Sequence, residues 1–526
     1  MKVLLVYPKC PDTFWSFSHA LKFTSKRALN TPLSVLTVAA LLPAEWKKKV
    51  IDMNITSLTD KDIKWADYVF LSAMIVQRNS ARSVIDRCHK LGIKVVAGGP
   101  LFTIGYQMWG FDDVEHLILN EGEINLPRFL EDLKNGCPKH VYQTGERSDM
   151  SKSPTPMFSL IDMRKYASVT IQYSRGCPHN CDFCNTIILD GRKPRTKTKD
   201  QILGELESIY NHGYRGSVFF VDDNLIGNRR KLKVDILPAI TTWQEQRGYP
   251  FNFLTEASID LADDDELTRL MSEAGFNSVF VGIESPNEES LIECNKYTNR
   301  NRNLLTSVRK LQNHGLQVMG GFIVGFDSDP SSIFKSQIEF IQKSGIVTAL
   351  INLLNAPVKT RLWQRLQKQN RILQEINTNT TTNNTDCLMN FIPKMRFDVL
   401  IDGYKEILNT IYAPRQYYGR IRNFLREYKP NRKLGSKSRP QIHLFVSFVK
   451  ATLVLGINDM ERLYYWKLFF TTLRKSPRSL GLVISFAAQG FHFRKIYEKI
   501  RDIRIDEDLL LKQRKVLDRE QLALLS

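Results

Sequence analysis

Short apolar runs that alternate with amphipathic stretches fill the first 144 residues. Helical spacing of the apolar positions predicts helices at residues 34–42 and 80–91. Apolar runs of strand length predict buried strands at residues 2–7, 49–52, 68–72, 94–100 and 115–119. Strands and helices in alternation form a doubly wound parallel sheet, which binds ligands outside the carboxyl ends of its strands. We therefore predict an α/β fold whose first domain, residues 1–144, is Rossmann-like.

A second series of strands follows a linker. Residues 145–162 are rich in Ser, Pro and Thr, and this composition predicts a linker between domains. Beyond it, further apolar runs predict strands at residues 168–173, 217–222, 251–256, 278–284, 317–325 and 348–354. Six β/α units form a partial (β/α)6 barrel of the TIM type, with functional residues at the carboxyl ends of the strands. We assign this barrel, open at one side for a large substrate, to residues 163–370.

The pattern changes again in residues 371–526, which we predict to form a basic, helical C-terminal domain. Residues 378–385 consist of Asn and Thr and predict an exposed loop. The apolar run at 442–455 is interrupted by Lys450 and is shorter than the ~18 to 20 residues of a membrane span. It predicts either a helix buried in a bundle that packs on the barrel, or a helix that lies in a lipid interface.

Composition and charge narrow the class of protein. The 526 residues are 43% hydrophobic and 25% charged, as in a globular protein of about two to four domains. The net charge is +19, and residues 411–526 hold 24 Lys and Arg against 10 Asp and Glu. This excess suits nucleic acid or an anionic membrane surface. The first residues do not resemble a signal peptide, so we expect a cytoplasmic protein, with peripheral membrane contact as an open alternative.

Three of the eight cysteines lie within eight residues, in the spacing C-x3-C-x2-C. They are Cys177, Cys181 and Cys184. The residues alone leave four interpretations open. A disulfide would need an oxidising compartment, a zinc site would need a fourth ligand such as His179, and the thiols could be merely structural. An iron–sulfur cluster held by three cysteines would leave one iron open to a substrate or cofactor.

With Phe183 before the third cysteine, the motif C-x3-C-x-(aromatic)-C resembles the signature of the radical S-adenosylmethionine superfamily. The resemblance implies that the three cysteines hold a [4Fe–4S] cluster whose fourth iron binds the methionyl group of S-adenosylmethionine. Reductive cleavage then gives a 5'-deoxyadenosyl radical, which removes hydrogen from an unactivated carbon. An electron donor such as flavodoxin or ferredoxin is implied as a partner.

Polar residues and glycines follow successive barrel strands. Each alone is more often a capping or solvated residue than a ligand contact. Together they resemble the superfamily's S-adenosylmethionine pocket, which implies binding roles for Phe183, Asp222, Asp223, Glu256, Gly282, Glu284 and Gly321. The aspartates occupy the place of a motif that binds the methionyl amine, and the glutamates would lie near the ribose and the sulfonium. The glycines would let the backbone approach the adenine.

A Rossmann-like domain directly before such a barrel is the layout of cobalamin-binding radical S-adenosylmethionine enzymes. The resemblance implies a corrinoid site at Ser72, Gly98, Gly99, Thr103 and Glu121. The D-x-H-x-x-G motif of other cobalamin proteins is missing, because no glycine follows His19 at the required spacing. This departure implies cobalamin without a histidine on cobalt. The loop at 12–17 either covers one face of the corrin or packs on the sheet.

The C-terminal extension resembles that of the subgroup containing hopanoid C-2 methyltransferases. These resemblances imply a cobalamin-dependent C-methyltransferase that acts on a large hydrophobic substrate, a hopanoid-like lipid or a chlorin. The alternative within enzymes is an oxidative cyclase of the tetrapyrrole type. Outside enzymes, a non-catalytic cobalamin or nucleic-acid binder is the alternative, and nucleic acid is the less favoured partner.

Overall fold

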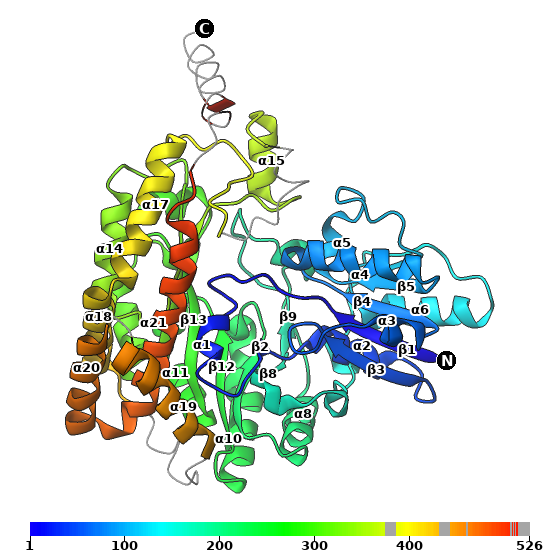
Figure 1. The fold of residues 1–526 in the computed structure, drawn as a ribbon, viewed down its shortest axis with the longest axis horizontal. Coiled ribbons are helices and arrows are strands. Elements are labelled where there is room, and N and C mark those ends of the chain that lie inside the picture. Colours follow the sequence, from blue (N-terminus) through cyan, green and yellow to red (C-terminus); the bar gives the residue numbers. More distant parts are fainter. Residues whose placement is uncertain are drawn as a thin grey trace.

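The computed structural model describes residues 1–373, 385–430, 442–458, 461–504, 508, 510 and 512–513. Apart from residue 385, the loop predicted at 378–385 lies outside the described residues. Figure 1 shows the N-terminal domain on the right, the barrel in the centre and the C-terminal helices on the left. The predicted α/β class with a helical C-terminal region is confirmed.

The N-terminal domain is a parallel sheet with helices on both faces. Its strand order is β3-β1-β4-β5-β6-β7. In that order the strands are Lys47–Asp52, Lys2–Tyr7, Tyr68–Ser72, Lys94–Gly98, His116–Ile118 and Val141–Tyr142. One face packs on α2 (Leu33–Leu41) and α6 (Gly122–Lys134). The other face packs on α3 (Asp60–Lys64), α4 (Arg78–Lys90) and α5 (Pro100–Gly105). The five predicted strands are confirmed, and the two-residue β7 was missed because it is too short to show a pattern.

The barrel sheet is also parallel, with the order β15-β14-β13-β12-β11-β8-β2. The six predicted strands are confirmed as Tyr166–Ile171 (β8), Gly216–Phe220 (β11), Phe251–Glu256 (β12), Phe276–Glu284 (β13), Gln317–Val324 (β14) and Ala349–Leu353 (β15). Its helices are α7 (Thr186–Leu189), α8 (Lys199–Asn211), α9 (Arg229–Lys231), α10 (Leu237–Gln246), α11 (Asp265–Ala274), α12 (Glu288–Glu293), α13 (Leu304–Asn313), α14 (Ile333–Ser344) and α15 (Arg361–Lys368).

The seventh barrel strand, β2 (Ala28–Asn30), comes from the N-terminal part of the chain. It pairs in parallel with β8, where Ala28 lies opposite Tyr166 and Asn30 opposite Ser168. The hydroxyl of Thr31, just beyond β2, lies 2.7 Å from that of Thr170 in β8. The first 144 residues therefore contribute to both sheets.

Side chains of the barrel strands alternate between two faces. In β12, Phe251, Phe253 and Thr255 are buried against the helices, whereas Leu254 and Glu256 face the other side and stay partly exposed. The two-residue period therefore brings the polar strand ends to the inner face of the barrel.

The C-terminal helices pack against the barrel. They are α17 (Phe397–Tyr412), α18 (Pro414–Glu427), α19 (Ile442–Leu453), α20 (Arg462–Lys475) and α21 (Leu480–Ile500). Tyr404, Tyr412, Tyr417 and Tyr418 are buried in this layer, and the Tyr412 hydroxyl donates to the carbonyl of Ala349 in β15 at 2.7 Å. A bundle packed on the barrel is thus confirmed. No helix in the described ranges has both the length and the hydropathy of a membrane-spanning segment.

The loop at 12–17 leaves the N-terminal domain and crosses to the barrel (Figure 1). The Phe14 ring lies 5.8 Å from Tyr412 and 6.3 Å from Phe493 in α21, and the Trp15 ring lies 5.2 Å from Phe280 in β13. The interpretation that it packs on the N-terminal sheet is therefore wrong, because its aromatic side chains contact the C-terminal helices and the barrel, where Phe14 is buried and Trp15 stays 42% exposed.

Candidate active site

The cysteine loop begins at the end of β8 and is anchored by Asp222, which follows β11. The N–H of Tyr173 donates to one carboxylate oxygen at 3.0 Å, and the hydroxyl and N–H of Ser174 donate to the other, the hydroxyl at 2.6 Å. Burial raises the pKa of Asp222 to about 6, although these donors oppose the shift. Because both oxygens are engaged, Asp222 supports the loop, and its predicted contact with S-adenosylmethionine gains no support.

Gly176, directly before Cys177, has a left-handed backbone with φ of 97°. A Cβ there would lie 2.7 Å from the carbonyl oxygen of Lys193. The close approach belongs to a short hairpin of β9 (Ser174–Arg175) and β10 (Arg195–Thr196). The N–H of Cys177 also donates to the carbonyl of Gly191 at 3.1 Å. Glycine is therefore required at position 176 for the backbone to place Cys177 in this orientation.

The three cysteines of the loop are half-buried free thiols, so the disulfide interpretation is wrong. Burial raises the pKa of each thiol, that of Cys181 to about 11, and the nearby Lys296 acts in the opposite direction on all three. The described residues contain no group of three His, Cys, Asp or Glu that could hold a single metal ion. A four-iron cluster binds its cysteines on different irons, so this three-thiol donor set fits a cluster with one open iron.

A buried ion pair lies beside the cysteine loop. Lys296 Nζ is 2.7 Å from a carboxylate oxygen of Glu284, and the two side chains are 14% and 8% exposed. Burial disfavours the charge on Lys296, but Glu284 and Cys181 outweigh it and raise the pKa of the lysine. Glu284 has a left-handed backbone with φ of 61°, at an irregularity between β13 and β14. Its carboxylate is thus engaged by Lys296 instead of being free for a sulfonium.

Side chains of the protein itself occupy the space beside the two glycines that were predicted to face adenine. A Cβ at Gly282 would lie 2.8 Å from Lys296 Nζ and would also meet the carboxylate of Glu284. A Cβ at Gly321 would lie 2.8 Å from the Phe280 ring. We predicted that these glycines let the backbone approach adenine. The structure instead shows that Gly282 makes room for an ion pair and Gly321 for an aromatic ring.

Two predicted carboxylates remain near the thiols. Asp223 accepts a hydrogen bond from the Thr186 hydroxyl at 2.9 Å, and Cys184 donates to the same hydroxyl at 3.3 Å. The side-chain carboxyl of Glu256, at the end of β12, makes no hydrogen bond or ion pair with a described residue. Burial, with smaller contributions from Asp223 and Asp222, raises the pKa of Glu256 to about 8. Binding of S-adenosylmethionine by Asp223 and Glu256 stays a prediction that the geometry favours.

Phe183, the aromatic residue of the cysteine motif, is partly buried in the barrel core. Its ring lies 6.3 Å from the ring of Phe326. This contact fixes the loop between the second and third cysteines, and the predicted contact of Phe183 with S-adenosylmethionine stays a prediction.

A cavity of about 350 Å³ lies at the carboxyl ends of the N-terminal strands. Its lining includes all the residues predicted for the corrinoid, namely Ser72, Gly98, Gly99, Thr103 and Glu121. The sheet, α2 and α6 supply its apolar wall; examples are Val35, Val38, Phe70 and Leu126. A cavity with an apolar wall and a few polar groups at one edge is typical of a cofactor site.

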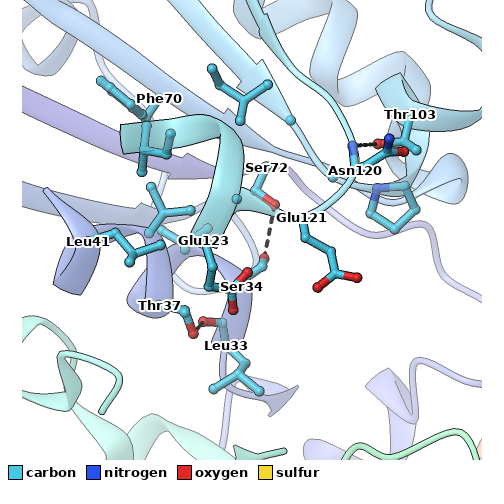
Figure 2. Close-up of a pocket in the computed structure, with 18 of the residues that line it drawn as sticks. Leu33, Ser34, Thr37, Leu41, Phe70, Ser72, Thr103, Asn120, Glu121 and Glu123 are labelled. Carbon is cyan, nitrogen blue, oxygen red and sulfur yellow. Dashed lines mark hydrogen bonds between the residues drawn. The ribbon is translucent and has the colours of Figure 1, made fainter. Parts of the chain in front are cut away.

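Hydrogen bonds within the lining hold the polar edge in place. Ser72 donates to the hydroxyl of Ser34 at 3.0 Å, and the N–H of Asn120 donates to the Thr103 hydroxyl at 2.9 Å, as Figure 2 shows. Gly99 has φ of 93°, and a Cβ there would lie 2.9 Å from the Ala73 carbonyl oxygen. The turn after β5 therefore requires glycine and presents bare backbone at the cavity.

The barrel closes one side of this cavity with residues that the sequence analysis missed. They are Gln172, Arg175, Leu189, Asp190 and Val221. Arg175 makes two hydrogen bonds to Glu123, of 2.7 and 2.9 Å, and a third of 2.9 Å to Gln172. Arg175 lies two residues before Cys177, and this proximity was the available signal. The cavity and the cysteine loop thus share a wall.

Glu121 joins the two domains. Arg195 of β10 donates to its two oxygens at 2.7 and 2.8 Å, and the N–H of Ser148 donates at 3.0 Å. Burial disfavours the charge, but Arg195 and Ser148 outweigh it and lower the pKa of Glu121. Most of its hydrogen-bonding capacity is therefore used inside the protein, and its predicted contact with cobalamin stays a prediction.

The described residues that line the cavity do not include a histidine. His19 lies elsewhere, with its ring 3.3 Å from the carboxylate of Asp12 and 5.6 Å from the ring of His492. Cobalamin without a histidine on cobalt, which the missing motif implied, stays a prediction.

Comparisons with known proteins agree with this geometry. Residues 171–340 match the Radical SAM superfamily, and residues 360–504 match a domain of unknown function, DUF4070. An uncharacterised methyltransferase of Synechocystis sp. is 39% identical over 528 residues, which cover 99% of this chain and 96% of that protein. Hopanoid C-2 methylase of Rhodopseudomonas palustris is 34% identical over 420 residues, covering 78% of this chain and 77% of that protein.

A solved structure has a similar fold. It is the radical S-adenosylmethionine methyltransferase TsrM from Kitasatospora setae, with cobalamin and a [4Fe–4S] cluster bound. The match covers 94% of this chain and 99% of TsrM, with a TM-score of 0.57 and 14% identity, and so supports the fold.

The similarity to two methyltransferases, over 99% and 78% of this chain, confirms the predicted enzyme class and favours methyl transfer over the cyclase and non-catalytic alternatives. The cofactors of the family are those that the sequence implied, a [4Fe–4S] cluster, S-adenosylmethionine and cobalamin. This chain therefore belongs to the cobalamin-binding radical S-adenosylmethionine methyltransferases.

Proposed function

We propose that the protein methylates an unactivated carbon of a large hydrophobic substrate, a hopanoid-like polycyclic lipid. The observation that carries this proposal is the shared wall between the cavity and the cysteine loop, formed by Gln172, Arg175 and Asp190. A corrinoid in the cavity and a cluster on the loop would face a common space. The similarity to hopanoid C-2 methylase supports the lipid class.

When bound, the cluster and S-adenosylmethionine supply a radical that removes hydrogen from the substrate, and the corrinoid supplies the methyl group. The three cysteines of the loop would hold the cluster. Lys296 places a positive charge beside them, held in position by Glu284. Asp223 and Glu256 would favour the cationic groups of S-adenosylmethionine, because a nearby positive charge stabilises the ionised carboxylate.

The inner face of the barrel supports an apolar substrate. Phe219 lies beside Leu254 in the strand register, and Glu256, Phe280 and Met319 lie side by side on three neighbouring strands. The four apolar members of this set are partly exposed. An apolar surface next to the Glu256 carboxyl can hold a polycyclic hydrocarbon while excluding water.

Protein partners complete the proposal. A flavodoxin or ferredoxin would deliver the electron that the cluster needs for each cleavage. A polycyclic lipid resides in a membrane, so peripheral contact of the C-terminal region with a membrane would bring enzyme and substrate together.

The test uses anaerobically reconstituted protein, a reductant, and S-adenosylmethionine with a deuterated methyl group. A hopene-type polycyclic lipid and a chlorophyllide are offered separately, and products are analysed by mass spectrometry. We expect the label on the lipid, and no product from a variant with all three loop cysteines changed to alanine.

Each other result has a distinct meaning. A labelled chlorin with an unlabelled lipid would refute the substrate class. Oxidised product without a methyl group would favour the cyclase, and absence of 5'-deoxyadenosine with every substrate would refute radical chemistry.

A further inference from the structure

Helix α20 carries apolar side chains on two opposite faces. Tyr465, Leu468 and Thr472 point inward and are buried against the neighbouring helices. The outer stripe, at spacings of three and four residues, consists of Leu463, Trp466, Phe470 and Leu473. Leu463 is 76% exposed, Phe470 58% and Leu473 47%. A helix with apolar side chains on both faces is normally buried on both, so the exposed outer stripe indicates a surface that another molecule covers.

The end of α19 and the π-helical turn Val454–Asn458 continue this surface. Val449, Leu453 and Ile457 recur every four residues and are exposed. The Trp466 indole N–H donates to the carbonyl of Gly456 at 2.9 Å, and this bond joins the turn to α20. We call the outer stripes of these two segments the α19–α20 face. Seven of the 15 exposed large hydrophobic side chains in the described ranges lie between residues 449 and 473.

Positive charge surrounds the α19–α20 face. Exposed basic side chains border it at Lys450, Arg462, Lys467, Arg474, Lys475 and Arg478. None of them forms an ion pair with a described residue. Lys467 and Arg474 follow Leu463 and Phe470 by four residues each, and so lie on the outer stripe of α20 itself. Glu461, the acidic residue described in this region, is buried and bound by Arg494.

We propose that the α19–α20 face docks on an anionic lipid bilayer. Aromatic and aliphatic side chains interleaved with Lys and Arg fit the boundary between headgroups and acyl chains, where each kind of side chain finds its preferred surroundings. The described helices are too short or too polar to span, so the face lies on the membrane. In Figure 1, α20 lies across the barrel from the N-terminal sheet, so docking leaves the N-terminal cavity uncovered.

This inference deepens the proposed function and rests on its membrane contact, because it names the surface that would make that contact, but its test needs no methyl transfer. The full-length protein is floated with vesicles of phosphatidylcholine containing one-third phosphatidylglycerol, and with pure phosphatidylcholine vesicles. We expect flotation with the anionic vesicles, reduced at high salt, and at least a tenfold lower partition coefficient on pure phosphatidylcholine.

Paired variants locate the surface. L463E/F470E and K467E/R474E should each lower the partition coefficient on anionic vesicles at least tenfold. The matched control V234E/V399E, which also places two glutamates at exposed apolar positions, should bind like the wild type. Thermal melting establishes that all variants are folded.

Two results would overturn the proposal. One is unchanged flotation of folded L463E/F470E. The other is a concentration-dependent dimer, seen by light scattering and dissociated by the same variant, because the face would then be a self-interface. Methylation of detergent-dispersed lipid is measured in parallel, so a failure of membrane docking is distinguishable from a failure of the proposed function.

Discussion

At the scale of single residues, carboxylates that look alike in the sequence have different roles. Asp222, Glu256 and Glu284 each lie at or just after the end of a barrel strand. Asp222 accepts hydrogen bonds from the cysteine loop, whereas Glu284 binds Lys296. Glu256 alone among them has no partner in the described residues, and burial keeps its pKa near 8. A carboxyl that is only partly exposed and has no partner is costly when ionised. Its position at the inner face of the barrel is consistent with the prediction that it binds a cationic group of S-adenosylmethionine.

Changing Glu256 to Gln tests this state in protein without S-adenosylmethionine. Folding raises the pKa from the ordinary 4.5 to about 8, so the folded chain holds the proton to higher pH than the unfolded chain. The stability that this contributes is complete below pH 4.5 and is lost as pH rises through about 8. We expect E256Q to exceed the wild type in unfolding free energy by roughly 1–3 kcal/mol at pH 8.5 and by less than about 1 kcal/mol at pH 5.

Urea titration at the two pH values measures the difference. The control is E289Q, at an exposed position of α12, which should behave like the wild type at both. A pH-independent effect of E256Q would contradict the raised pKa.

The cysteines give a second prediction at this scale. Replacing Cys177, Cys181 and Cys184 together with alanine should abolish the broad iron–sulfur absorbance of reconstituted protein, because no other described residues gather three thiols. The exposed Cys137, changed to alanine, serves as the control and should leave the spectrum intact. An undiminished cluster in the triple variant would refute the assignment.

At the scale of elements, the loop at 12–17 and α21 form a contact between the two ends of the chain. The ring of the fully buried His492 accepts a hydrogen bond from the N–H of His19 at Nδ1 and donates from Nε2 to the carbonyl of Phe14. Protonation of Nδ1 would remove the first bond. Burial lowers the pKa of His492 to about 4, so the neutral ring is the folded form at neutral pH.

Acid should therefore loosen this contact. The unfolded chain binds the proton near pH 6.5 and the folded protein only near 4, so the stability from His492 is lost as pH falls through this range. We expect faster backbone hydrogen exchange in residues 12–21 at pH 4.5 than at pH 7, after correction for intrinsic rates, and no such change in α8. Asp12 and Lys499 lie near the same rings. If the change persists in H492F, these charges and not the imidazole cause it.

At the scale of the whole molecule, ion pairs lock the N-terminal domain to the cysteine hairpin. Arg195 binds Glu121 and Arg175 binds Glu123, and all four side chains are at most 16% exposed. Glutamates at the start of α6 thus hold the strands that lead to Cys177. The relative position of the two proposed cofactors depends on this network.

Removing the charge of Glu121 should weaken the coupling between the N-terminal domain and the barrel. In E121Q, the guanidinium of Arg195 keeps its burial but loses its counter-ion, which costs on the order of 3–5 kcal/mol. We expect a lower unfolding temperature by calorimetry, with separate transitions for the two domains in place of one. The control E146Q breaks an exposed pair with Arg128 and should change the unfolding free energy by less than about 1 kcal/mol. Equal stability of both variants would show that the network does not couple the domains.

Local patterns in the sequence determined the strands, the cysteine motif and the edge of the sheet where ligands bind. Apolar runs of strand length recur because buried parallel strands need them. Ser72, Gly98 and Gly99 fall at strand ends that parallel pairing brings to one edge, and the family resemblance added Thr103 and Glu121. All five residues line one cavity.

Tertiary structure alone decided which groups are paired. Glu121 and Arg195 are 74 residues apart, and Glu123 and Arg175 are 52 apart, so no local pattern could reveal these contacts. The same holds for β2, because Ala28 and Asn30 pair with Tyr166 and Ser168, which lie 138 residues further along the chain. The outer stripe of α20 also required the structure, because periodicity shows that a helix has two apolar faces but not which one its neighbours cover. Pairing and burial depend on what the rest of the chain places alongside a residue, and this only the folded molecule fixes.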